Sequence, residues 1–63
     1  MNWNWINVYD KEPEIGQRCM VKGDKNTYYE CVYSGRNLSY HPLFKVEKEE
    51  NKYVVNYEYA IID

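Results

Sequence analysis

The sequence is poor in the residues that build large cores and membrane spans. Leu, Ile, Val and Phe together make up about a fifth of the 63 residues, close to the limit below which chains tend to be disordered. Its apolar runs fall far short of the roughly 20 residues that cross a bilayer. The first residues also lack the basic segment and apolar run of a secretory signal. We therefore expect a cytoplasmic location and no membrane association.

Cationic blocks and metal-ligand clusters are equally scarce. The formal net charge is −2 and Lys and Arg form no block, which argues against binding to duplex nucleic acid through many phosphates. Cys19, Cys31 and His41 are the only thiols and the only imidazole, and their spacing is not that of a zinc site. The three glycines stand singly, so no phosphate-cradling loop is present. We expect no metal and no cofactor.

The sequence holds no complete set of catalytic groups. Ser39 and His41 would share a face in an extended segment, but no acid and no oxyanion turn flank them to complete a triad. The acidic residues lack metal-ligand spacing as well. The sequence therefore predicts a protein that is not an enzyme.

Tyrosine is abundant, with eight among the 63 residues, and it offsets the thin aliphatic content because each ring can be half-buried while its hydroxyl stays satisfied. Alternation of apolar and polar residues recurs along the chain, whereas a helical stripe does not. We predict a single all-β domain spanning residues 1–63, with about five short antiparallel strands in one twisted sheet or a small SH3-like barrel. The expected strands cover residues 3–9, 18–22, 27–33, 43–47 and 53–62, with turns at residues 23–26, 34–37 and 49–51.

The second and third strands are expected to form a hairpin. If the chain turns at residues 24–26, residues whose numbers sum to 50 face each other, and Cys19 lies opposite Cys31. A cross-strand disulfide is geometrically conceivable. In a reducing cytosol we instead expect two buried thiols that act as small apolar side chains.

The last predicted strand is long and free of Gly and Pro. Tyr53, Tyr57 and Tyr59 share one of its faces with Val55 and Ile61. Its expected partner is shorter, so part of the strand pairs elsewhere or leaves an exposed edge, which is a template for another chain. The sequence predicts that these tyrosines form an interface, through homodimerisation or through strand addition to a partner.

A second group of aromatic residues lies near turns. Rings can stack on a planar ligand and nearby cations can take an anionic group. The predicted binding surface comprises Lys22, Tyr28, Tyr33, Arg36 and Tyr40. Trp5 is instead expected to anchor the core, because Trp is seldom left exposed.

The first 35 residues contain several short motifs in a defined order: Trp5-Ile6-Asn7-Val8, Pro13, Gly16, Arg18-Cys19-Met20-Val21 and Tyr33-Ser34-Gly35. This order resembles a family of short phage and prophage proteins of unknown function, which share a Trp-Ile-x-Val opening, a charged loop with Pro and Gly, and an aromatic strand. The resemblance implies a phage origin and no particular activity.

Small size, a phage-like opening and surplus interface residues favour a counter-defence protein that acts by stoichiometric binding. Its partner would be a bacterial immune effector such as a CRISPR nuclease, whose cationic groove would meet the carboxylates of Glu12, Glu14, Glu47, Glu49 and Glu50. One alternative is an oligomer that sequesters a nucleotide immune messenger, with phosphates on Arg36, Lys22 or Lys45. The other is a prophage accessory module that joins larger partners.

Overall fold

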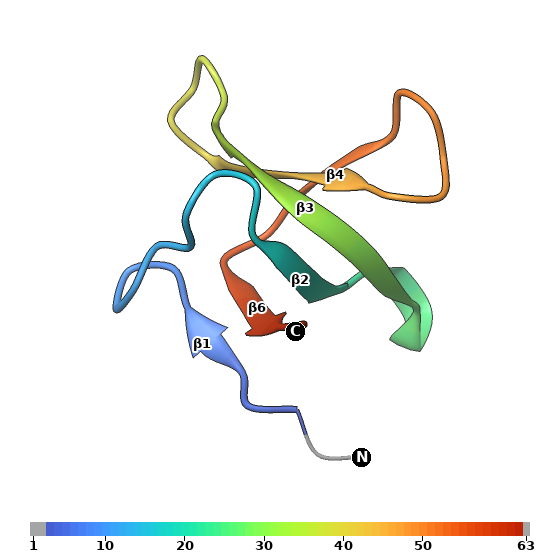
Figure 1. Ribbon diagram of the computed structural model, residues 1–63, viewed down its shortest axis with the longest axis horizontal. Coiled ribbons are helices and arrows are strands. Elements are labelled where there is room, and N and C mark those ends of the chain that lie inside the picture. Colours follow the sequence, from blue (N-terminus) through green and yellow to red (C-terminus); the bar gives the residue numbers. More distant parts are fainter. Residues whose placement is uncertain (1–2, 63) are drawn as a thin grey trace.

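The computed structural model describes residues 3–62 and shows one antiparallel sheet of six strands (Figure 1). Apart from one 3-10 turn, this part of the chain holds no helix, and the all-β prediction is confirmed. The count is six rather than five because the last predicted strand is split in two. The elements are β1 (Ile6–Asn7), β2 (Arg18–Lys22), η1 (Asp24–Asn26), β3 (Tyr28–Arg36), β4 (Pro42–Val46), β5 (Tyr53–Val55) and β6 (Glu58–Ile61).

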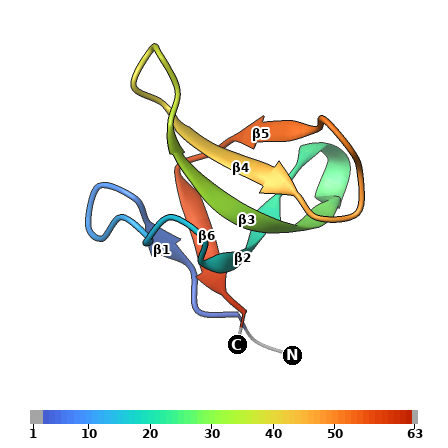
Figure 2. The same cartoon turned by 45° about the horizontal axis from the view of Figure 1, so that its top comes forward.

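The sheet curls on itself without closing into a barrel. The strand order is β1-β6-β2-β3-β4-β5, so β5 lies at one edge and β6 lies next to the other. Only two residues join β5 to β6, and such a link spans no more than about 10 Å. The end of β5 therefore lies near the start of β6, as Figure 2 shows, while no strand pairing between β5 and β6 links them within residues 3–62.

The β2–β3 hairpin has the register that the sequence predicts. Cys19 faces Cys31, and the pairs on either side follow the same rule, from Arg18 opposite Val32 to Lys22 opposite Tyr28. The chain reverses through η1, where Lys25 and Asn26 adopt positive φ angles of 54° and 63°.

β3 is longer than predicted because Gly35 forms a bulge instead of a turn. Between Tyr33 opposite Phe44 and Arg36 opposite Pro42 the register shifts by one residue on β3, and Gly35 has a φ of +87°. A glycine at positive φ is typical of such a bulge. The chain turns instead at residues 37–40, where the side-chain oxygen of Asn37 accepts hydrogen bonds from the backbone N–H groups of Ser39 and His41 at 3.0 and 2.9 Å. The prediction of a turn at residues 34–37 is wrong.

The predicted last strand is interrupted at Asn56 and Tyr57. The Oδ1 atom of Asn56 accepts hydrogen bonds from the N–H groups of Tyr57 and Glu58 at 2.8 and 3.3 Å, so its side chain competes with strand pairing for these backbone groups. Its Nδ2 atom donates to the carbonyl of Lys22 at 2.6 Å. Asn56 therefore bends the chain and holds the bend against the end of β2.

The opening strand is also shorter than predicted, since only Ile6 and Asn7 pair with β6. The loop that follows is hydrogen-bonded to β3 instead. The N–H of Gly16 donates to the carbonyl of Tyr33, and the N–H of Tyr33 donates to the carbonyl of Gln17, both at 2.9 Å. This pairing places the loop of residues 10–17 beside the bulged end of β3.

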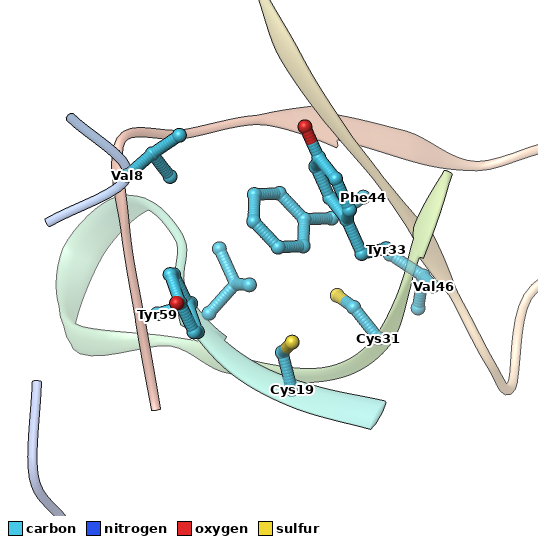
Figure 3. Close-up of a cluster of buried hydrophobic side chains, with 8 residues drawn as sticks. Val8, Cys19, Cys31, Tyr33, Phe44, Val46 and Tyr59 are labelled. Carbon is cyan, nitrogen blue, oxygen red and sulfur yellow. The ribbon is translucent and has the colours of Figure 1, made fainter. Parts of the chain in front are cut away.

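The core lies inside the curl of the sheet (Figure 3). Phe44 occupies its centre, with ring centroids 5.1 Å from Tyr33 and 6.3 Å from Tyr59. Alternate residues of β2, β3 and β4 point inward, as half-buried strands require. The buried apolar residues are Val8, Cys19, Val21, Cys31, Tyr33, Phe44, Val46, Tyr59 and Ala60.

Both thiols are free and buried in this core, as predicted. Burial raises the pKa of Cys19 to about 11 and that of Cys31 to about 12. Thiols with such pKa values remain protonated at neutral pH and are poor nucleophiles.

Candidate functional site

Aromatic rings gather where the loop of residues 8–17 meets the end of β3. The ring of Tyr9 stacks on that of Tyr57, with centroids 5.4 Å apart and an interplanar angle of 11°. His41 approaches Tyr57 edge-on, with a centroid distance of 6.0 Å, and its Nδ1 atom is hydrogen-bonded to the Tyr57 hydroxyl. Burial raises the pKa of Tyr57 above its ordinary value.

Arg36 lies beside these rings in a fixed geometry. Its Nε and Nη2 atoms donate to Oε1 of Glu12 at 3.2 and 3.1 Å, and its Nη1 atom donates to the carbonyl of Tyr40 at 2.8 Å. The guanidinium carbon lies 5.8 Å from the centroid of the Tyr40 ring, within reach of a cation–π contact. The bulge at Gly35 sets the direction of Arg36, which is what bulges commonly do.

We call Tyr9, Arg36, Tyr40, His41 and Tyr57 the tyrosine cluster. Tyr9 and Tyr40 are 76% and 78% exposed. Ile15 and Leu38, on the two loops that carry the cluster, are also exposed. Aromatic residues and arginine are enriched in protein interfaces relative to the rest of a protein surface.

The predicted binding residues do not form one surface. Lys22 and Tyr28 flank η1 at the start of β3, whereas Arg36 and Tyr40 lie at or beyond its other end. The nine residues of β3 span about 26 Å at the usual rise per residue. The residues predicted as one binding surface therefore lie at two separate ends of β3.

Tyr33 is not a surface residue, and this part of the prediction is wrong. Its ring is 1% exposed and packs against Phe44, because position 33 alternates with Cys31 on the inner face of β3. Only its hydroxyl reaches the rim, where it donates to Oε2 of Glu12 at 2.5 Å. Burial, with this bond as the next cause, raises the pKa of Tyr33 to about 12.

The predicted stripe of Tyr53, Tyr57 and Tyr59 is also wrong, because the break at Asn56 sends the three rings to different places. Tyr59 is buried, and its hydroxyl donates to the carbonyl of Lys11 at 2.6 Å. Tyr57 belongs to the tyrosine cluster, and Tyr53 is half-exposed on β5. The N–H of Val46 donates to the carbonyl of Lys52. Hydrogen-bonded and non-hydrogen-bonded pairs alternate along antiparallel strands, so the backbone N–H and C=O of the next residue, Tyr53, point toward the open edge of the sheet. Self-association through this segment stays a prediction that concerns β5 alone.

A groove lies between β5 and the η1 end of the β2–β3 hairpin, with a volume of about 620 Å³. Trp5, expected in the core, is 38% exposed and lies in this groove with its ring centroid 6.0 Å from that of Tyr28. Lys22 and Tyr28 were predicted as binding residues, whereas Trp5, Lys52 and Asn56 were not, because only the curl of the sheet brings them to the hairpin. The groove is lined by Trp5, Lys22, Gly23, Asp24, Tyr28, Tyr29, Lys52, Val54, Val55, Asn56 and Glu58.

Several carboxylates expected to face a cationic partner are paired within the chain. Glu47 accepts hydrogen bonds from Arg18 at 2.8 and 3.2 Å, Glu12 pairs with Arg36, and Glu49 lies 3.9 Å from Lys52. Glu14 and Glu50 are exposed. These pairs neutralise much of the negative charge that a nucleic-acid mimic would present.

Within residues 3–62, no three His, Cys, Asp or Glu side chains are placed to hold a metal ion together. The same part of the chain contains no helix that is long and apolar enough to span a membrane. Comparison of the chain with family models, with curated proteins and with solved structures finds no match.

Proposed function

We propose that the chain is a phage-encoded counter-defence protein that binds a bacterial immune effector, such as a CRISPR nuclease, in the host cytoplasm and blocks it without catalysis. The observation that carries the proposal is the exposed tyrosine cluster. Tyr and Arg are the residues that most often dominate the energy of protein interfaces. Phage origin rests on the sequence resemblance over the first 35 residues.

The tyrosine cluster has two properties of an effective protein-binding surface. Arg36 is already held by Glu12 and by the carbonyl of Tyr40, so little side-chain entropy is lost when a partner binds. Tyr9 and Tyr40 have only two side-chain torsions each and offer large exposed rings. The paired carboxylates of Glu12 and Glu47 make nucleic-acid mimicry a weaker mechanism than contact through these rings.

The test is phage plating on a bacterial host that carries a CRISPR nuclease directed against the phage. Expression of the chain should restore plaques, and the double variant Tyr9→Ser, Tyr40→Ser should not. Tyr53→Ser is the matched control, because it removes an exposed ring from β5 on a different part of the surface and should restore plaques as the unchanged chain does.

Equal protection by the double variant would remove the tyrosine cluster from the proposal. If the chain binds a bacterial protein but relieves no defence, the counter-defence function is wrong and an accessory module is the better description. Thermal unfolding of each variant confirms that any loss of protection arises in a folded protein.

A further inference from the structure

The groove presents two aromatic rings to solvent at one wall. Trp5 and Tyr28 are 38% and 51% exposed, and their planes are inclined by 30°. Rings at this angle contact each other, and each ring keeps part of its surface exposed to solvent. A flat heteroaromatic group can stack on such a ring, and this contact contributes about 1–3 kcal/mol per nucleic-acid base in known sites.

A fixed cation lies at another wall of the same groove. The ammonium of Lys52 donates to the hydroxyl of Tyr29 at 3.3 Å and lies 4.8 Å from the centroid of its ring. The Tyr29 ring in turn lies directly over Gly23, where an added Cβ would be 2.4 Å from the ring carbon Cε2. The absence of a side chain at Gly23 therefore lets Tyr29 hold Lys52 at the groove, and Lys22 lines the groove as well.

The remaining polar groups limit the charge of a ligand. Asp24 and Glu58 line the groove together with Lys22 and Lys52, and Glu49 lies 3.9 Å from Lys52, so negative side chains balance the positive ones. A polyanion would meet repulsion there, whereas a ligand with one anionic group and several hydroxyl or amino donors finds both partners that it needs. The volume of about 620 Å³ lies in the range of small-molecule sites.

From these three features we propose that the groove binds a nucleoside monophosphate. The base stacks on Trp5, the phosphate pairs with Lys52, and the sugar hydroxyls or base amino groups donate to Asp24 and Glu58. This site is distinct from the tyrosine cluster, because it lies at the other end of β3. It does not depend on the proposed binding of an immune effector.

The experiment follows the fluorescence of Trp5 in a Trp3→Phe background, in which Trp5 is the only indole. The protein is titrated separately with AMP, GMP, CMP and UMP, and then with the matching nucleoside and nucleoside triphosphate of the best binder. We expect saturable quenching by at least one monophosphate. The nucleoside should bind about tenfold more weakly or worse, and the triphosphate no more tightly than the monophosphate.

Lys52→Gln should weaken binding of the monophosphate about tenfold or more and leave binding of the nucleoside unchanged. Lys25→Gln is the matched control, since it removes the same charge from η1, next to the groove, at a residue that does not line it. Absence of quenching by all four monophosphates would overturn the proposal. Equal affinity for nucleoside and monophosphate, tighter binding of the triphosphate, or full affinity in Lys52→Gln would also overturn it.

Discussion

At the scale of single residues, Glu12 joins the loop of residues 10–17 to the end of β3. The hydroxyl of Tyr33 is the main cause that holds the pKa of Glu12 below its ordinary value of 4.5; burial partly opposes it, and Arg36 lowers the pKa further. A carboxylate with a lowered pKa stabilises the folded state above its unfolded pKa, and this stabilisation is lost as the pH falls through its folded pKa.

Glu12→Gln should therefore lower the melting temperature at pH 7, and the difference from the unchanged protein should shrink as the pH falls from about 4.5 to 3. Circular dichroism melts over this pH range measure the effect. A difference in melting temperature that stays constant from pH 7 to pH 3 would show that the charge of Glu12 is not what stabilises the loop.

The two thiols give a second prediction at this scale. Because burial raises the pKa of both Cys19 and Cys31, neither should react with a disulfide reagent at pH 8 in the native protein, and both should react in urea. Stability should also fall as the pH rises above about 9, since the unfolded thiols then release protons that the folded thiols retain. Rapid labelling of either thiol in native buffer would contradict this account.

At the scale of elements, the bulge in β3 positions Arg36. Gly35 has a φ of +87°, and an added Cβ would lie 3.2 Å from Cδ1 of Ile15. Gly35→Ala should lower the free energy of unfolding by about 1–3 kcal/mol. Gly16→Ala is the control, because Gly16 has a similar φ of +96° and open space around it. Urea unfolding should show the larger loss for Gly35→Ala, and equal losses would mean that the contact with Ile15 contributes nothing.

The bend between β5 and β6 depends on Asn56. Asn56→Ala removes two acceptor contacts and one donor contact, and we expect a loss of about 1–3 kcal/mol, which is several degrees in melting temperature for a domain of this size. Asn56→Asp keeps the acceptor oxygen and loses the bond to the carbonyl of Lys22, so its melting temperature should fall between the other two. An Asn56→Ala protein as stable as the unchanged chain would show that the strands bend without this side chain.

The β2–β3 hairpin, the bulge at Gly35 and the break at Asn56 show which parts of the fold the sequence predicts. The β2–β3 hairpin is local, and its alternation and turn residues are enough to give its bounds and the pairing of Cys19 with Cys31. The bulge at Gly35 and the break at Asn56 each arise from one residue inside an alternating segment: a glycine at positive φ in one case, and a side chain that bonds the next two N–H groups in the other. The alternation of side chains between the two faces continues through Asn56 and Tyr57, so this alternation alone predicts one strand. The structure has two strands instead.

The candidate sites differ from prediction because residue type alone does not show which side chains the fold buries or brings together. Residue type correctly suggests Tyr40 as a surface residue, but it cannot separate Tyr33, which is buried, from Tyr28, which is half-exposed. Tyr9 and Tyr57 are 48 residues apart in the chain, and they stack because the pairing of β1 with β6 continues to a bond between Val8 and Tyr57.

At the scale of the whole molecule, the curl of the sheet places two unlike surfaces at the two ends of β3. The radius of gyration is 10.7 Å, close to the value of about 10.6 Å expected for a compact chain of this length. The core of such a small chain is thin, yet Tyr9 and Tyr40 remain exposed. In the proposed function, these exposed rings are the surface that the immune effector would cover.

Calorimetric titration of the chain into a purified bacterial CRISPR nuclease complex tests the proposed binding most directly. The account predicts saturable heat with one chain per nuclease site, abolished by the double variant Tyr9→Ser, Tyr40→Ser and unchanged by Tyr53→Ser. Heat of the same size and affinity from the double variant, or no heat at all from the unchanged chain, would contradict it.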